Sequence, residues 1–161
     1  MAAVRQADAT WSGNLTDGKG TVSAVSSGVF NALPTTWASR VETSDGRTSP
    51  EELLAAAHAS CFSMAFSNEL FKKGFTADRL AVTARVTLDM TDAGRRVVSS
   101  ALAVTGAVPG IDAATFAEIA EVAKNGCPIS NAIKDNVALS VAATLESCSV
   151  ALGSALGGSP G

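Results

Sequence analysis

The sequence predicts an α+β fold in which antiparallel strands surround one long central helix. A stretch with helical features at both ends occupies the middle of the chain, from Ser49 to Gly74. Segments with strand-like patterns are grouped before and after it instead of alternating with helices, and there is no internal repeat. A chain of 161 residues with 47% hydrophobic residues is large enough for one domain with its own core.

Composition and charge exclude several classes of protein. The net charge is -3 and no basic run is longer than two residues, so neither nucleic acid nor a membrane surface is expected as a partner. The first residues, 1–11, lack the apolar segment of a secretion signal, and we therefore expect a cytoplasmic protein. Cys61, Cys127 and Cys148 with a single histidine do not reach a zinc-site spacing, so no metal or cofactor is predicted. In a reducing compartment these cysteines are either inert or redox-active.

The chain before the central helix is predicted to form strands. Residues 7–11 and 21–25 read as the two strands of a hairpin, because Asp17-Gly18 can supply the positive φ that a tight turn needs. Residues 29–42 also have strand-like character and contain Arg40. This arginine therefore lies just ahead of the helix.

The central helix has clear start and stop signals. Ser49 can act as N-cap with Pro50 in the first turn and Glu52 three residues later, which is the pattern of a capping box. Gly74 can adopt the left-handed conformation that ends a helix. Apolar or small residues occupy nearly every face between positions 53 and 66, so we expect the helix to be buried in a core.

The chain after the helix is predicted to contain a long hairpin. Apolar side chains fall on every second position over residues 80–90, which indicates a strand with one buried face. A turn at 91–94 leads into a returning antiparallel strand over 97–108.

Two helices and a final strand complete the predicted domain, which spans residues 1–147. Asp112 can cap a helix from Ala113 to about Lys124, whose apolar face consists of Phe116, Ile119, Ala120 and Ala123. A short helix then runs from Pro128 to Ile133, and a last strand covers about 136–146. Residues 148–161 are rich in Gly and Ser and are expected to form a flexible tail.

Two cysteines are candidates for chemistry. Cys61 in mid-helix is either a small buried hydrophobe or a reactive thiol, and a reactive thiol there would need an external cation because a helix interior offers no free amides. Cys127 precedes a helix, where exposed amides favour a thiolate. His58 lies three residues before Cys61, so a Cys–His pair is conceivable, although a packed, hydrogen-bonded histidine is the favoured interpretation.

Glu51 most simply complements the helix dipole, but its position also limits any role at Cys61. The two residues lie ten positions apart, about 15 Å along a continuous helix. They cannot touch within one chain. If Glu51 acts on a cysteine site, that site belongs to a neighbouring subunit whose helix runs antiparallel, and a two-fold dimer follows.

Several motifs resemble those of the OsmC/Ohr family, the osmotically inducible protein C and organic hydroperoxide resistance proteins. These motifs are SPEELLAAAHASCFSMA at 49–65, VPGIDA at 108–113, KNGCPIS at 124–130 and Trp11-x-Gly13 followed by GKGTVS at 18–23. The resemblance runs from about residue 8 to 145, and HASCFSM is more similar to the OsmC branch than to the Ohr branch.

This resemblance implies a thiol-dependent peroxidase for oxidative or osmotic stress defence. It assigns Cys61 as the peroxidatic cysteine, Cys127 as the resolving cysteine, Arg40 as the catalytic arginine and Glu51 as its acidic partner, whereas Cys148 matches nothing in the pattern. The expected substrates are organic hydroperoxides, with hydrogen peroxide as a second candidate, and a dithiol would reopen the disulfide.

The resemblance also implies an intertwined homodimer, in which antiparallel sheets wrap around two long central helices and the active sites lie at the subunit interface. Two alternatives to a peroxidase stay open at this point. One is a non-enzymatic dimeric redox sensor or binding module, and the other is a hydrolase that uses Cys61 and His58.

Overall fold

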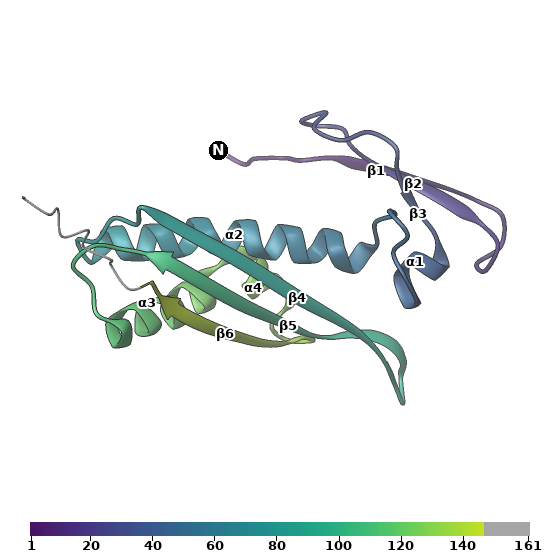
Figure 1. Ribbon diagram of the computed structural model, residues 1–161. Coiled ribbons are helices and arrows are strands. Elements are labelled where there is room, and N and C mark those ends of the chain that lie inside the picture. Colours follow the sequence, from purple (N-terminus) through teal and green to yellow (C-terminus); the bar gives the residue numbers. More distant parts are fainter. Residues whose placement is uncertain (147–161) are drawn as a thin grey trace, which may run out of the picture.

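The computed structural model describes residues 1–146 and confirms the α+β class (Figure 1). One sheet has the strand order β1-β2-β3, and its strands are Ala7–Ser12, Lys19–Ala24 and Leu33–Thr35. The other has the order β4-β5-β6, and its strands are Arg79–Thr91, Gly94–Ala107 and Ala138–Leu145. The helices are α1 (Trp37–Val41), α2 (Pro50–Lys72), α3 (Ala113–Gly126) and α4 (Pro128–Ile133). The predicted tail and Cys148 lie outside the described residues.

Helix α2 begins and ends where the sequence predicts. The Ser49 hydroxyl accepts a hydrogen bond of 3.1 Å from the Glu52 amide, and Pro50 occupies the first turn. Gly74 adopts a φ of 85° just beyond the C-terminus. The second half of the predicted capping box is wrong, because the Glu52 carboxylate accepts a hydrogen bond from the Thr48 hydroxyl instead.

Only one face of α2 is buried in this chain. The buried residues are Glu51, His58, Phe62, Phe66 and Leu70, and this face packs on β4, α3 and α4. The opposite face is exposed and carries Ala56, Ala57, Ser60, Met64 and Phe71. A single chain therefore buries only part of the predicted core helix, since nothing in residues 1–146 covers this second face.

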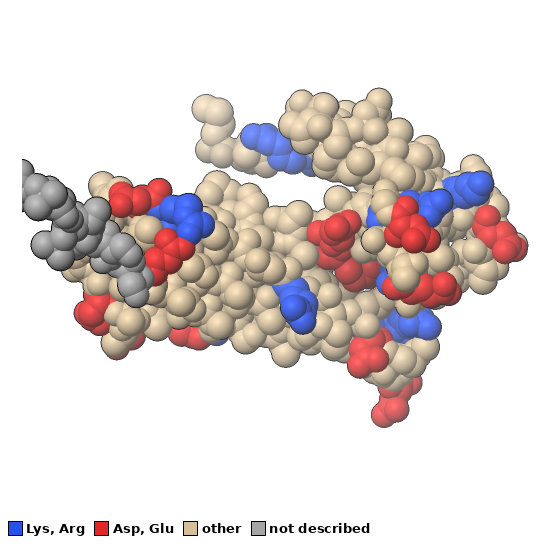
Figure 2. All heavy atoms as spheres, in the orientation of Figure 1, with Lys and Arg blue, Asp and Glu red and all other residues tan. Residues whose placement is uncertain are grey.

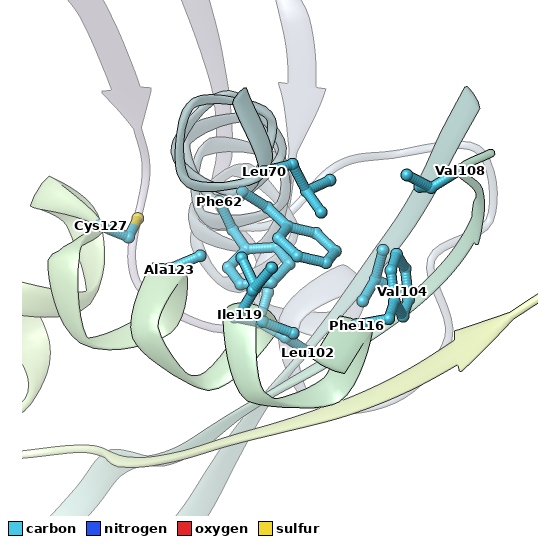
Figure 3. Packing of buried hydrophobic residues seen from close by; sticks show 11 residues of the cluster. Phe62, Leu70, Leu102, Val104, Val108, Phe116, Ile119, Ala123 and Cys127 are labelled. Carbon is cyan, nitrogen blue, oxygen red and sulfur yellow. The ribbon is translucent and has the colours of Figure 1, made fainter. Parts of the chain in front are cut away.

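The core lies between α2, α3 and the β4-β5-β6 sheet (Figure 3). The ring of Phe66 packs between the rings of Phe62 and Phe116, with centroid separations of 5.6 and 4.9 Å. The predicted apolar face of α3 is confirmed, because all four of its residues are buried. Cys127 lies at the margin of this cluster, where α3 ends.

The second sheet is mixed. Strands β4 and β5 form the predicted antiparallel hairpin, and Gly94 supplies a φ of 92° in its turn. Strand β6, however, pairs with β5 in parallel, from Ser99 opposite Ala138 to Gly106 opposite Leu145. The prediction of an entirely antiparallel sheet is wrong here, because α3 and α4 form a crossover that returns the chain to the end of the sheet where β5 began.

The first sheet has almost no interior. Every residue of β1 is exposed, and within residues 1–50 only Gly18 and Gly20 are buried. The ring of Trp11 lies over both glycines, since a Cβ at either position would come within 2.8 Å of it. Glycine at these positions therefore allows the tryptophan to pack flat on β2.

The turn between β1 and β2 differs from the predicted one. The positive φ in this loop belongs to Gly13, at 90°, and Gly18 is not among the residues with positive φ. Gly18 is needed instead for close approach, because its amide donates to the Asn14 carbonyl and a Cβ would lie 2.2 Å from that oxygen. The predicted Asp-Gly turn is therefore wrong.

Residues 29–42 contain a helix that the sequence analysis missed. The Thr36 hydroxyl accepts from the Ser39 amide at 3.1 Å, and the Ser39 hydroxyl accepts from the Thr36 amide at 3.0 Å. This reciprocal capping ends the strand-like segment after Thr35 and starts α1. As a result Arg40 is placed on a helix, directly before α2.

Candidate active site

The two predicted reactive cysteines lie together. Cys61 is in the middle of α2 and partly exposed, whereas Cys127 is fully buried at the N-cap of α4, and both are free thiols. Their side chains are within hydrogen-bonding reach of each other. Cys61 also lines a surface groove together with Met64, Ala123 and Pro128. A small molecule can therefore reach Cys61 but not Cys127.

Several groups act on the ionisation of Cys61. Burial is the largest effect and raises the pKa of this thiol, and the neighbouring Cys127 raises it further. The backbone amide of Ile129, in the first turn of α4, hydrogen-bonds the Cys61 sulfur and acts in the opposite direction. No cationic side chain of the described chain contributes to this pKa. The thiolate in a single chain thus has an amide donor but no counter-charge.

Arg40 and Glu51 form a second pair, at the start of α2. Arg40 Nε and Nη2 donate to Glu51 Oε1 at 2.9 and 2.8 Å, and Nε also reaches Oε2 at 3.2 Å. Glu51 is 8% exposed. The Arg40 guanidinium carbon also lies 5.9 Å from the centre of the Trp37 ring. The guanidinium carbon of Arg95 lies 5.4 Å from the centre of the same ring. These contacts fix the orientation of Arg40.

The structure therefore places the four predicted site residues as two separate pairs. Because α2 is one continuous helix, Glu51 and Cys61 are about 15 Å apart along its axis. The Arg40–Glu51 pair lines a hollow with Ala84 and Val86, whereas Cys61 opens into the groove beside α3 and α4. Within one chain the arginine does not reach the cysteine.

His58 is a fully buried histidine with two hydroxyl partners. Its Nδ1 lies 2.7 Å from Ser100 Oγ on β5, and its Nε2 lies 2.9 Å from Ser130 Oγ on α4. Burial lowers the pKa of His58. Since both ring nitrogens are engaged, His58 is the packed, hydrogen-bonded histidine favoured by the sequence and not a free base for Cys61.

Sequence analysis missed three groups near the cysteines: the Ile129 amide, Ser100 and Ser130. It assigned the amides of α4 to Cys127, but the structure directs the Ile129 amide to Cys61. Ser130 lies inside the KNGCPIS motif, which was a signal for it, whereas nothing in the sequence around Ser100 marks it as a partner of His58.

The described residues were also compared with what a metal site or a membrane helix requires. Residues 1–146 contain no group of three or more His, Cys, Asp or Glu side chains arranged to hold a metal ion. Among the helices of this part of the chain, none combines the length and apolarity of a membrane span.

Known proteins share the sequence pattern of this chain. Residues 43–142 match the family described as OsmC-like protein. The chain belongs to the OsmC family. It is 47% identical to peroxiredoxin OsmC of Escherichia coli over 139 residues, which cover 86% of this chain and 96% of that protein. Peroxiredoxin OsmC of Shigella flexneri is similar to the same extent, and the predicted OsmC branch is thereby confirmed.

Solved structures of this family have the same fold. The organic hydroperoxide resistance protein OhrB of Bacillus subtilis superposes with a TM-score of 0.68 at 22% identity, covering 88% of this chain and 98% of that one. An OsmC-like protein of Mycoplasma pneumoniae gives a TM-score of 0.69 at 15% identity, covering 91% and 100%. At these identities the likeness shows the fold alone, and it agrees with the α+β arrangement of strands and helices described above.

Proposed function

We propose that this member of the OsmC family is a thiol-dependent peroxidase that reduces organic hydroperoxides at Cys61. Its identity of 47% to peroxiredoxin OsmC over most of both chains supports the peroxidase class. The observation that carries the mechanism is the pairing of an accessible Cys61 with a buried Cys127. The accessible Cys61 thiol can react with a peroxide, and the buried Cys127 thiol can then form a disulfide with it.

In the first step the Cys61 thiolate attacks the terminal oxygen of the hydroperoxide. A sulfur–oxygen bond forms, the oxygen–oxygen bond breaks, and the leaving alkoxide takes up a proton to become an alcohol. Cys61 is thereby oxidised to a sulfenic acid. Cys127 then attacks this sulfur, forms a disulfide and releases water, and an external dithiol reduces the disulfide by exchange.

We infer that a second copy of the chain completes the site with its Arg40–Glu51 pair. Burial alone disfavours the Cys61 thiolate, so a positive charge is needed to offset it. The bidentate contact with Glu51 would hold the guanidinium in one orientation while it stabilises the thiolate and polarises the peroxide. Since the arginine of the same chain is too far away, the partner's arginine is the candidate.

The exposed face of α2 supports an antiparallel arrangement of two such helices. If Glu51 of one copy lies opposite Cys61 of the other, the helices cross midway between these residues, at Ala56. Ala56, Ala57 and Ser60 are small and exposed, and small side chains allow two helices to approach closely. The middle of this helix is thus suited to a two-fold contact.

The first sheet supports the same arrangement. A three-stranded sheet that buries no residue except two glycines is not stable alone in water. Figure 1 shows it alongside α2, on the side away from the second sheet, and in the view of Figure 2 the charged side chains gather mostly toward the two ends of the molecule. A second copy inserted between the first sheet and α2 would cover both.

Peroxide consumption by the purified protein with a dithiol reductant tests this function. We expect turnover with cumene hydroperoxide to exceed turnover with hydrogen peroxide, because apolar Met64 and Ala65 line the groove at Cys61. Cys61→Ser should lose turnover completely. Cys127→Ser should form a sulfenic acid at Cys61 that dimedone traps, without forming the disulfide.

Two results would contradict the proposal. Peroxide consumption by Cys61→Ser at the parent rate would show that another group does the chemistry. Stoichiometric oxidation of the parent without turnover in excess dithiol would indicate a redox sensor or binding module instead.

A further inference from the structure

His58 joins three elements of the fold through side chains. It projects from α2 and is hydrogen-bonded to Ser100 of β5 through Nδ1 and to Ser130 of α4 through Nε2. All three side chains are buried, with 0% exposure for His58 and Ser100 and 2% for Ser130. Breaking either hydrogen bond at this depth is costly, because it would leave a buried donor or acceptor with no water to replace its partner. The bridge therefore holds the three elements in one arrangement.

Helix α4 carries both groups that act on Cys61 within this chain. Cys127 is its N-cap residue, and Ile129, in its first turn, supplies the backbone amide that reaches the Cys61 sulfur. The helix has only six residues, and its N-cap side chain makes no capping hydrogen bond. Such a short helix does not fix its own position by backbone hydrogen bonds alone.

Within α4 itself, residues 128–133, one described side chain hydrogen-bonds α2: Ser130, which reaches His58. The other side-chain hydrogen bonds of α4 are local, from Asn131 to the Asn125 carbonyl and from Lys134 to Asn131, and Ile129 packs on the core. Ser130 follows Ile129 directly, and His58 precedes Cys61 by three residues on the same helix. Helices α2 and α4 are therefore joined at two neighbouring points. At one, the His58 imidazole meets Ser130, and at the other, the Ile129 amide meets the Cys61 sulfur.

We propose that His58 is a positioning residue that holds α4 against α2, so that the Ile129 amide and Cys127 both stay directed at the Cys61 sulfur. The imidazole does not take part in proton transfer, because both nitrogens are engaged by serine hydroxyls. Ser130 is the half of the bridge that reaches α4, whereas Ser100 anchors the ring to the sheet. This role rests on the proposed chemistry at Cys61 and Cys127 and adds a residue whose hydrogen bonds go to neither thiol.

A matched pair of variants separates positioning from stability. Ser130→Ala and Ser100→Ala each remove one hydroxyl and leave one nitrogen of His58 without its partner, so both should lower the unfolding temperature similarly. Only Ser130→Ala removes the hydrogen bond that joins α4 to α2. Both variants are made in a chain that also carries Cys127→Ser and Cys148→Ser, so that Cys61 is the single thiol.

The first readout is the rate of Cys61 alkylation by iodoacetamide as a function of pH, which needs no peroxidase activity. Loss of a hydrogen bond to the thiolate should raise the pH midpoint in Ser130→Ala by about one unit, equivalent to a roughly tenfold lower thiolate population at neutral pH. Ser100→Ala should stay within about twofold of its parent. A merely structural histidine would move both variants alike.

The second readout is formation of the Cys61–Cys127 disulfide after one equivalent of cumene hydroperoxide, with only Cys148→Ser in the background. We expect Ser130→Ala to accumulate sulfenic acid and to close the disulfide about tenfold more slowly, because Cys127 is no longer held in place. Ser100→Ala should close it at the parent rate. Mass spectrometry after quenching distinguishes the two species.

Two substitutions of His58 itself give an independent test. The amide group of Gln extends as far as Nε2, whereas that of Asn extends only as far as Nδ1, so His58→Gln retains a partner for Ser130 and His58→Asn retains one for Ser100. We expect His58→Gln to restore the parent alkylation profile and His58→Asn to reproduce Ser130→Ala.

Equal alkylation midpoints for Ser130→Ala and Ser100→Ala, or for His58→Gln and His58→Asn, would overturn the positioning role. This result can be told apart from failure of the proposed function. If the parent showed no peroxide turnover but the paired variants still differed in alkylation, the bridge would stand and the reaction assigned to Cys61 would be wrong.

Discussion

Residues 50–146 and residues 1–49 form two very different parts of this molecule. The first part has a core of aromatic and aliphatic side chains from α2, β5 and α3, which accounts for its order within one chain. The second part has a sheet with an entirely exposed outer strand and two buried glycines. A sheet of that kind obtains its stability from contacts with something else. Residues 50–146 are thus a self-contained part, whereas residues 1–49 would depend on the partner proposed above.

The candidate site residues are divided between the same two parts. Arg40 comes from α1 in residues 1–49, and both cysteines come from residues 50–146. Helix α2 connects them, since Glu51 holds the arginine at its start and Cys61 lies in its middle. In the proposed dimer, residues 1–49 would depend on the partner and would also supply it with Arg40, so assembly would be coupled to reactivity.

The largest effect is expected from mixing two inactive variants. Arg40→Ala and Cys61→Ser should each lack peroxidase turnover. When they are co-refolded in equal amounts, about half of the dimers are mixed and each mixed dimer contains one complete site, so about one quarter of the parent turnover should return. Turnover with cumene hydroperoxide measures the result.

A mixture of the parent with the doubly substituted chain, Arg40→Ala with Cys61→Ser, is the matched control. Its mixed dimers contain no complete site, and their formation therefore lowers turnover instead of restoring it. If differently tagged subunits are shown to have mixed and no turnover returns, the arginine does not act across the interface.

A smaller effect is expected from a charge placed on the exposed face of α2. Ala57→Glu would bury a carboxylate between two helices, and an unpaired buried charge costs several kcal/mol, so we expect the dissociation constant of the dimer to rise at least about 100-fold. Sedimentation equilibrium measures it.

Ala114→Glu is the control for this substitution. Ala114 is exposed in the first turn of α3, where an added carboxylate complements the helix dipole, and the change in stability should stay within about 0.5 kcal/mol. Equal dissociation constants for the two variants would mean that the α2 face is open to solvent in the native assembly.

Features that depend on neighbouring residues could be predicted from the sequence. The serine cap and the glycine stop define α2, and four apolar residues at helical spacing identify the buried face of α3. The two cysteines were also identified correctly as neighbours, but only through resemblance to a family. Spacing alone does not bring positions 61 and 127 together.

Features that depend on distant contacts could not be predicted. The parallel pairing of β6 follows from where α3 and α4 deliver the chain. The apolar or small residues on nearly every face of α2 do not reveal which face its own chain covers. The requirement for Gly18 arises from the Trp11 ring and the Asn14 carbonyl, which a turn pattern cannot show. The Ile129 amide at Cys61 is likewise a contact between separate helices.

The smallest effect concerns a cap in the self-contained part. Asp112 caps α3, and the amide and the hydroxyl of Thr115 hydrogen-bond its carboxylate and lower its pKa. Since the folded pKa lies below the unfolded one, ionised Asp112 contributes stability above the ordinary aspartate pKa, and the contribution is lost as the pH falls through the lowered value. Asp112→Ala should therefore lower the unfolding temperature at pH 7, by an amount that shrinks in acid.

Asp112→Asn sharpens this test, because asparagine is also a good N-cap but does not titrate. The difference between Asp and Asn should disappear at low pH, while the difference between Asn and Ala should stay constant. In residues 1–49 the corresponding cap is Thr36, which has no titratable group, so the same pH change should leave this cap unaffected. A pH-independent gap between Asp112→Ala and the parent would show that the hydrogen-bonding geometry of Asp112, and not its charge, stabilises α3.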